Sequence, residues 1–306
     1  MLFRSNPEKE EVKSTAVGVI GLGIMGSAMS ANLVLAGFKT YGYDVLPARR
    51  QALKKAGGVP LGSPAEVAKK AAVIITSLPS AQALHEVSKL IAGKAIVVET
   101  STLPIDDKIR ARDALKRKGI TLLDCPLSGT GAQARNKDLS VYASGERAAY
   151  QKITRVLEGF ARSHYFLGEF GNGSKMKFVA NLMVAIHNVS AAEAFALGMK
   201  AGLDPATILK VAGDGAGTSR MFQVRGPMMV AGRYHDATMR IAVWQKDMKI
   251  IGDFAMKLGV ATPLFSASGA IYNAAMAQGF EQEDTAAVCA VLERMSGVRR
   301  RTRTGR

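Results

Sequence analysis

The feature of this 306-residue sequence that most constrains its fold is a change of pattern near Gly171. Before it, short β-branched runs alternate with helical patterns, which predicts βαβ units and a doubly wound parallel sheet, an α/β fold. After it, alanine, methionine and leucine dominate, which predicts an all-helical region. The predicted strands are Val17–Ile20, Phe38–Tyr43, Val73–Thr76, Ile96–Val98, Ile120–Leu123 and Leu139–Ala143.

Local start signals place several helices. In Ser63-Pro64-Ala65-Glu66 a capping serine precedes proline at the first helical position, and Asp204-Pro205 follows the same logic. The second half is expected to begin with a long, mostly apolar helix that joins two domains. The expected ranges are 23–36 in the first half, then 173–200, 236–258 and 263–276, and a helix starting near Glu283.

A glycine-rich loop follows the first predicted strand and opens the first predicted helix: Gly21-Leu22-Gly23-Ile24-Met25-Gly26. An acidic residue, Asp44, ends the next strand about 20 positions later, as a dinucleotide site requires. The helix N-terminus offers free N–H groups to the pyrophosphate, and Asp44 can bind the adenosine ribose. A carboxylate there favours NAD over NADP, but Arg49 and Arg50 lie near enough to accept a 2′-phosphate, so NADP stays possible.

Three other segments follow predicted strands, where ligands of open α/β sheets bind. Leu78-Pro79 and Ser101-Thr102 are candidates for the cofactor. The hydroxyl of Thr102 can meet the nicotinamide ribose or cap the following helix. The third segment runs from Asp124 to Gly131 and places small hydroxyl residues among glycines, which suits a carboxylate.

The start of the long helix carries the candidate catalytic groups. Lys177 and Asn181 are four residues apart, so they share one face of the helix. Lys177 stands where polar residues give way to an apolar run, and a desolvated lysine can exchange protons near neutral pH. Asn181 can orient a substrate oxygen or the lysine, while Lys175 is the expected solvated neighbour.

Taken together, these motifs resemble the β-hydroxyacid dehydrogenase family over roughly residues 16–298. The resemblance implies a Rossmann domain over 1–170 and a helical substrate and oligomerisation domain over 171–298. It implies NAD(P)-dependent interconversion of a small anionic 3-hydroxy acid and its aldehyde or ketone, in a homodimer or homotetramer. Lys177 and Asn181 would be catalytic, and Thr102 and Lys246 would touch the cofactor. The substrate carboxylate would be held by Ser128, Gly129 and Thr130.

The sequence departs from the family pattern at two positions. Thr130 replaces a glycine, and Leu182 replaces a frequent second asparagine. Both departures are expected near the substrate, so they bear on which acid is used. An NADPH-linked reductase of small aldehydes remains an alternative within the enzymes.

The net charge and the aromatic content limit the functional classes other than an enzyme. The net charge is +16, and five arginines in 299–306 form a basic tail expected to be solvated; without them the charge is +11. A non-catalytic dinucleotide-fold module with a basic surface is therefore an alternative. Nucleic acid is an unfavoured partner, because the sequence has no recognised nucleic-acid-binding motif and aromatic residues make up only 6% of it. Arg220, Arg225 and Arg240 are possible anchors for an acidic substrate, with solvated side chains the expected case.

Composition also bears on metal binding, disulfide bonds, membrane spans and cellular location. The four scattered histidines and two cysteines favour no metal and no disulfide framework, so a cytoplasmic protein is expected. No apolar stretch reaches the ~20 residues of a bilayer span. Residues 1–14 are expected to be a flexible end without a targeting signal.

Overall fold

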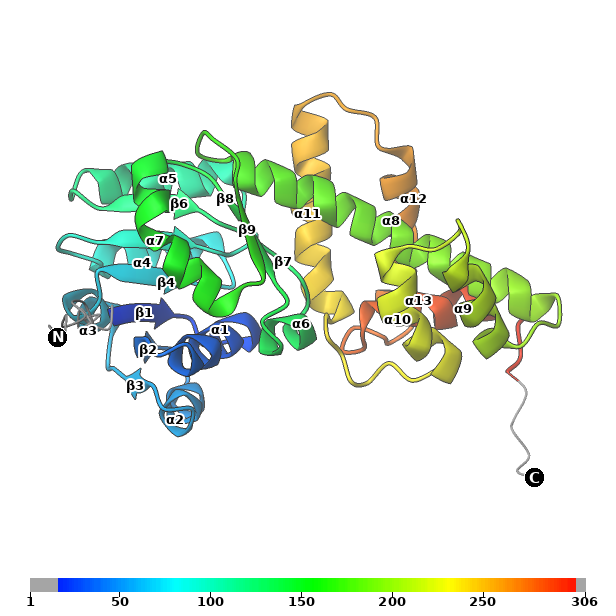
Figure 1. The fold of residues 1–306 in the computed structure, drawn as a ribbon. Coiled ribbons are helices and arrows are strands. Elements are labelled where there is room, and N and C mark those ends of the chain that lie inside the picture. Colours follow the sequence, from blue (N-terminus) through cyan, green and yellow to red (C-terminus); the bar gives the residue numbers. More distant parts are fainter. Residues whose placement is uncertain (1–15, 301–306) are drawn as a thin grey trace, which may run out of the picture.

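The computed structural model describes residues 16–300, and its first half is built on a six-stranded parallel sheet (Figure 1). The strand order is β3-β2-β1-β4-β5-β6, with the reversal of direction beside β1 that the doubly wound fold requires. The strands are β1 (Ala16–Ile20), β2 (Lys39–Tyr43), β3 (Val59–Pro60), β4 (Val73–Thr76), β5 (Ile96–Glu99) and β6 (Thr121–Asp124).

Helices cover both faces of this sheet, so the central strands are buried on both sides. In β4, Val73 and Ile75 pack into one hydrophobic cluster and Ile74 into the other. This is why an unbroken apolar run makes a strand here. The helices of this half are α1 (Ile24–Leu35), α2 (Pro47–Lys55), α3 (Pro64–Lys70), α4 (Ala81–Leu90), α5 (Ile105–Lys116), α6 (Gly131–Arg135) and α7 (Arg147–Phe160).

The predicted start of α3 is confirmed atom by atom. The Ser63 hydroxyl accepts a hydrogen bond from the Glu66 backbone N–H at 3.2 Å, and the Glu66 carboxylate accepts one from the Gly62 N–H at 2.9 Å. Two N–H groups at the helix start are thereby satisfied, which is what makes this sequence a helix start.

The sixth predicted strand, Leu139–Ala143, is not part of the large sheet. It forms β8 (Ser140–Ala143) in a separate sheet of order β7-β8-β9, with β7 (Leu127–Ser128) and β9 (Ser163–Phe166). β8 pairs antiparallel with β7 and parallel with β9. An apolar run specifies a buried strand but not its partner, so assigning it to the doubly wound sheet was wrong.

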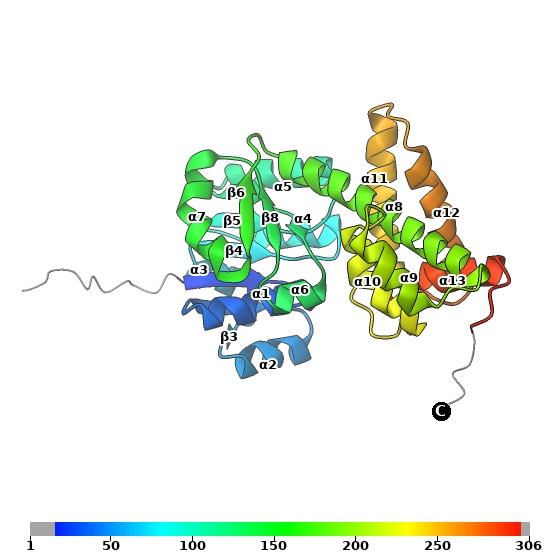
Figure 2. The same cartoon turned by 45° about the vertical axis from the view of Figure 1, so that its right-hand side comes forward.

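The second half is helical and is organised around α8 (Asn172–Lys200), which runs out of the first domain and through the second (Figures 1 and 2). One hydrophobic cluster unites these helices, with α8 contributing Phe178, Ala185, Val189 and Phe195. The other helices are α9 (Pro205–Asp214), α10 (Arg220–Ala231), α11 (Ile241–Lys257), α12 (Pro263–Ala277), a 3₁₀ turn at Thr285–Ala287 and α13 (Val288–Met295).

One predicted helix start was wrong and another was confirmed, and both involve Asp284. The helix expected from Asp236 begins at Ile241, because Thr238 and Met239 donate their N–H groups to the Asp284 carboxylate at 2.7 and 3.1 Å. The helix expected near Glu283 begins as the 3₁₀ turn, which Asp284 caps through the Ala286 N–H. The helix α10 was not predicted.

By length and composition alone, α8 could cross a membrane: an 18-residue window has mean hydropathy 1.4, and 44% of that window is buried in the fold. The helix is 29 residues long. Its buried positions include the polar Asn181 and Asn188, and Asn188 donates to the Tyr272 hydroxyl at 2.9 Å. These contacts are those of a helix at the centre of a folded domain.

The basic tail is docked at its first part. Arg300 donates to the Glu293 carboxylate, to the Val230 carbonyl at 2.9 Å and to the Met229 carbonyl at 2.6 Å. The expectation of a wholly solvated tail from 299 was therefore wrong at Arg300, whose guanidinium satisfies carbonyls at the end of α10. Arg299 is exposed, as expected, whereas residues 301–306 and the expected flexible segment 1–14 lie outside the described residues.

Candidate active site

The predicted glycine loop has the shape of a phosphate cradle. A Cβ at Gly21 would lie 2.1 Å from the Ser77 carbonyl oxygen, and one at Gly26 would lie 1.8 Å from that of Gly21. These two glycines allow the tight turn and the close packing of α1. A Cβ at Gly23 would meet nothing within 4 Å, so the backbone that begins α1 faces open space. The residues present therefore fit a dinucleotide pyrophosphate at the helix N-terminus.

The neighbouring positions of the loop are placed differently. Leu22 is buried in the core, Met25 packs against the same cluster, and Ile24 is exposed. Thus Leu22 and Met25 hold the loop on the sheet through their side chains.

Asp44 is buried at the end of β2, beside this loop. Its carboxylate accepts the Leu22 N–H at 2.7 Å and the Leu46 N–H at 2.9 Å, and it pairs with Arg49 at 3.2 Å. Arg50 donates to the Asp44 carbonyl and lies over the Tyr43 ring. The acid and both arginines therefore meet at the end of β2, beside the glycine loop.

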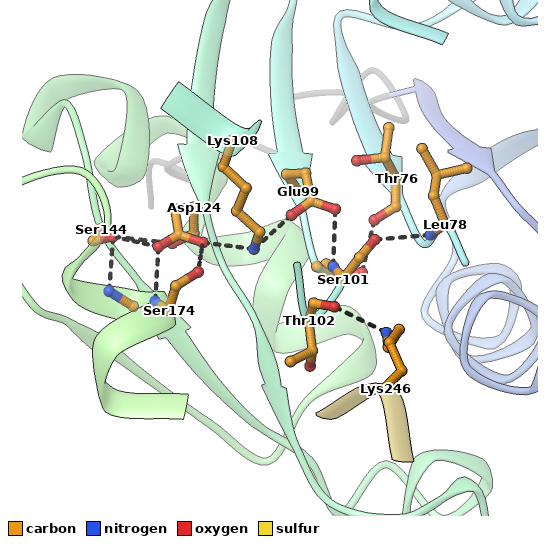
Figure 3. Close-up of polar contacts among 12 residues, drawn as sticks. Thr76, Leu78, Glu99, Ser101, Thr102, Lys108, Asp124, Ser144, Ser174 and Lys246 are labelled. Carbon is orange, nitrogen blue, oxygen red and sulfur yellow. Dashed lines mark hydrogen bonds and ion pairs between the residues drawn. The ribbon is translucent and has the colours of Figure 1, made fainter. Parts of the chain in front are cut away.

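Two further strand ends carry the other cofactor candidates (Figure 3). The Leu78 N–H donates to the Ser101 hydroxyl at 2.8 Å, and the exposed Pro79 follows. The Thr102 carbonyl accepts a hydrogen bond from Lys246 Nζ at 2.9 Å. Thr102 does not cap α5, whose N-cap is Pro104 without a side-chain bond. Lys246 of α11 thus connects the helical domain to the carboxyl end of the sheet.

A cavity of about 560 Å³ lies between the two halves of the chain and brings the remaining candidates together. Ser128, Gly129 and Thr130 line it from the first half, and Lys177 and Asn181 line it from α8. The other lining residues are Gln133, Asp138, Ser140, Arg162, Met183, Val184, His187, Arg220, Met221, Arg225, Met239 and Trp244.

Lys177 is buried, and burial lowers its pKa to about 8. The positive charge of Lys246 adds to this shift, whereas the carboxylate of Asp247 opposes it. Asp247 is itself buried, which raises its pKa, and it accepts a hydrogen bond from the Asn181 amide at 3.0 Å. A lysine with such a pKa can take up and release a proton near neutral pH.

The helix that carries Lys177 is fixed to the sheet by a buried carboxylate. Asp124, at the end of β6, accepts hydrogen bonds from the Ser174 N–H and hydroxyl, both at 2.8 Å (Figure 3). The Ser144 hydroxyl donates to the same carboxylate at 3.2 Å and accepts from the Gly173 N–H. Asp124 therefore satisfies donors in the first turn of α8, where the Gly171 N-cap offers no side chain.

This carboxylate belongs to a buried charge network. Lys108 of α5 is fully buried, and its Nζ lies 2.8 Å from Asp124 and 2.6 Å from Glu99. Burial disfavours the ammonium form, but the two carboxylates outweigh it and raise the pKa of Lys108. Glu99 also accepts the Ser101 N–H at 2.9 Å. The network thus joins the cofactor-side loop at Ser101 to the start of α8.

Sequence reasoning placed several side chains wrongly. Arg225 is buried and pairs with Asp284 at 3.2 Å, so it is not solvated; the buried acid and the apolar helix around the arginine were the available signs. Leu182 packs in the helical core and does not line the cavity. Arg240 is exposed and outside the cavity, as expected. The local sequence around Asp247 assigned it no role, because its partner Asn181 lies 66 residues away.

Thr130 lines the cavity and also has a structural task. Its side chain accepts from the Gln133 N–H, and its own N–H donates to the Gln133 amide oxygen at 3.0 Å, so the two form a capping box that starts α6. The N–H of Thr130 is thereby occupied, and Ser128 and Gly129 line the same wall. Among the described residues, no group of three or more His, Cys, Asp or Glu is placed to hold a metal ion.

Comparison with known families gives two matches that together cover most of the described chain. Residues 16–168 match the NAD-binding domain of 6-phosphogluconate dehydrogenase. Residues 171–292 match the NAD-binding domain of NADP-dependent 3-hydroxyisobutyrate dehydrogenase.

Individual relatives cover nearly the whole chain. An L-threonate dehydrogenase of Cupriavidus necator is 33% identical over 287 residues, covering 91% of this chain and 96% of the relative. A 2-(hydroxymethyl)glutarate dehydrogenase of Eubacterium barkeri is 29% identical and covers 94% and 97%. The crystal structure of a 3-hydroxyisobutyrate dehydrogenase from Salmonella typhimurium superposes with a TM-score of 0.83 at 28% identity, covering 90% and 99%.

Proposed function

The chain belongs to the β-hydroxyacid dehydrogenase family and is an NAD(P)-dependent oxidoreductase, and we propose that Lys177 is the general acid and base with which it interconverts a small 3-hydroxy acid and its carbonyl product. The observation that carries this proposal is the buried Lys177, with a pKa of about 8, in one cavity with Ser128 and Gly129. The contact of Lys246 of α11 with the Thr102 carbonyl, at 2.9 Å, supports closure of the helical domain onto a cofactor loop.

In oxidation, neutral Lys177 accepts the proton of the substrate hydroxyl. In reduction, its ammonium returns the proton and stabilises the developing negative charge on oxygen. The bound nicotinamide supplies the hydride acceptor or donor. With a pKa of about 8, most of the lysine is protonated at pH 7, which favours the reductive direction under neutral conditions.

Asn181 and the carboxylate-binding wall orient the substrate in this proposal. The Asn181 amide donates to Asp247, which leaves its carbonyl oxygen to accept from the substrate hydroxyl or from Lys177. Ser128 and Gly129 hold the carboxylate through the hydroxyl and the backbone, and Thr130 shapes the wall as the cap of α6.

The cofactor is held along the carboxyl ends of the strands. We assign the pyrophosphate to the loop from Gly21 to Gly26, and the nicotinamide end to the backbone around Leu78, Pro79 and Thr102. Asp44 supports a preference for NAD, because a buried carboxylate repels a 2′-phosphate. Arg49 and Arg50 support use of NADP as a second cofactor, since both guanidinium groups lie at the same strand end.

Two further proposals concern the setting of the enzyme. Exposed apolar side chains on the helical domain, such as Leu197, Leu203 and Val211, support a homo-oligomer, either dimer or tetramer. The two cysteines, Cys125 and Cys289, are buried and unpaired, which supports a reducing, cytoplasmic location. Light scattering of the purified chain tests the first proposal, and fractionation of the source cells tests the second.

The decisive experiment follows reduced nicotinamide with NAD and then NADP across a panel of 3-hydroxy acids. Lys177→Ala should lower turnover by about 10²–10⁴-fold and leave cofactor binding intact. Lys175→Ala is the matched control, because Lys175 is exposed and its Nζ donates to the Asn172 side chain at 3.0 Å. Equal activity of the two variants would refute the role of Lys177. Cofactor binding without Lys177-dependent turnover of any acid would instead favour a binding module.

A further inference from the structure

The cavity carries more positive charge than one substrate carboxylate requires. Four basic side chains line it, Arg162, Lys177, Arg220 and Arg225, against a single acid, Asp138. Arg225 is neutralised by Asp284 behind the wall. Lys177 has its chemical task at the buried end. The two remaining guanidinium groups therefore face the cavity with one carboxylate between them.

The two arginines lie toward solvent and come from opposite sides of the cavity. The side chains of Arg162 and Arg220 are 62% and 66% exposed, whereas Lys177 is 9% exposed. Arg162 follows α7 in the first domain, and Arg220 is the first residue of α10 in the helical domain. A ligand that spans the cavity from Lys177 outward would thus meet a guanidinium from each domain.

The contacts of Asp138 leave Arg220 incompletely satisfied. Arg162 Nε donates to Asp138 Oδ1 at 2.7 Å, and the Gln133 amide donates to Oδ2 at 3.1 Å. These hydrogen bonds lower the pKa of Asp138. Arg220 lies 3.8 Å from the same Oδ2, beyond hydrogen-bond distance, and its guanidinium makes no hydrogen bond within residues 16–300. Its donors are free for a second anion.

We propose that Arg220, with Arg162 opposite, forms a second anion site at the outer end of the cavity, and that the substrate is a 3-hydroxy acid with a second anionic group remote from its hydroxyl. This group is a carboxylate or a phosphate, both of which match the guanidinium fork. The inference rests on the proposed function, since it places the reacting carboxylate at Ser128 and Gly129.

The size of the cavity fits such a substrate. About 560 Å³ lies within the range of roughly 300–1,000 Å³ that holds drug-sized ligands, well beyond the needs of a four-carbon acid. A simple ion-pair latch between the domains is the competing role for these side chains. It is disfavoured by the distance of 3.8 Å and the exposure of both arginines.

The test compares 2-(hydroxymethyl)glutarate with its C5 monoamide, which keeps the shape but lacks the second charge. A third probe carries a phosphonate in place of the C5 carboxylate and identifies the preferred anion. The wild-type protein should prefer the better dianion by about tenfold in kcat/KM, the size of one exposed charge-assisted hydrogen bond. The preference should fall as salt is raised.

Two variants separate anion binding from a structural role. Arg220→Met should remove the preference by raising KM for the dianions, and it should bind cofactor normally. Asp138→Asn should raise the preference, because a repelling carboxylate is lost, whereas a domain latch would be weakened and activity with both substrates would fall. Arg240→Met is the matched control, since Arg240 is exposed at the start of α11 outside the cavity.

The outcomes distinguish this inference from the proposed function. Equal kcat/KM for the dianions and the monoamide, or an equal loss for both in Arg220→Met, overturns the second anion site and leaves the dehydrogenase assignment standing. A dianion preference that Arg220→Met abolishes and Arg240→Met keeps supports it. Absence of Lys177-dependent turnover with every probe and with the simple 3-hydroxy acids overturns both.

Discussion

Replacing Lys108 by methionine should strongly destabilise the sheet domain. The lysine is fully buried, and its Nζ lies 2.6 Å from Glu99 and 2.8 Å from Asp124. Without the cation, two carboxylates remain in the interior with no counter-charge. Breaking a buried pair in this way costs about 3–5 kcal/mol, out of the roughly 5–15 kcal/mol that stabilises a typical domain. The unfolding midpoint should fall by about 10 °C.

Thermal unfolding followed by circular dichroism measures this loss. Lys249→Met is the matched control, since Lys249 pairs with Asp253 on an exposed face of α11 and should not shift the midpoint. A triple variant, Glu99→Gln with Lys108→Met and Asp124→Asn, should recover much of the lost stability, because no charge is then buried. Equal midpoints for Lys108→Met and Lys249→Met would refute the argument that the buried charges are uncompensated without Lys108.

Two further predictions concern the active site. The rate of oxidation should rise with pH and level off above about 8 as Lys177 loses its proton. Asp247→Asn removes a carboxylate that raises the pKa of Lys177, so the midpoint of this pH profile should move to lower pH. An unmoved pH profile of kcat in the variant would contradict the electrostatic account. Gly26→Ala should disrupt the loop and lower the melting temperature, because the new Cβ would lie 1.8 Å from the Gly21 carbonyl oxygen. Gly23→Ala should keep the wild-type melting temperature and lose only cofactor affinity, measured by fluorescence titration. Equal stability of the two variants would contradict the packing argument.

The elements that the sequence predicted well are those whose causes are local. The strand Val73–Thr76 and the start of α3 at Ser63 were predicted at the right residues, because an apolar run and a capping box act within a few positions. The start of α11 was misplaced because Asp284, 46 residues from Thr238, holds the preceding segment in a loop. The strand at Leu139–Ala143 was misassigned for the same reason, since the choice of β7 and β9 as partners is made through space.

The same division explains what could be predicted of the site. Lys177 and Asn181 are one helical turn apart, so their shared face follows from spacing alone, and the structure places both on one cavity. The contact of Asn181 with Asp247 joins α8 to α11, and the burial of Arg225 depends on Asp284. No periodicity carries these pairings, because each depends on how helices distant in sequence pack.

The pKa of Lys177 shows how the fold reconciles burial with reactivity. Burial and Lys246 both disfavour the ammonium form and lower the pKa of Lys177. The charge of Asp247 opposes them, and its carboxylate also accepts a hydrogen bond from Asn181 at 3.0 Å and lies 3.5 Å from Lys246. The balance leaves the pKa at about 8, so both protonation forms are populated near neutrality. A reversible dehydrogenase requires this, since each direction of the reaction uses the opposite form of the same lysine.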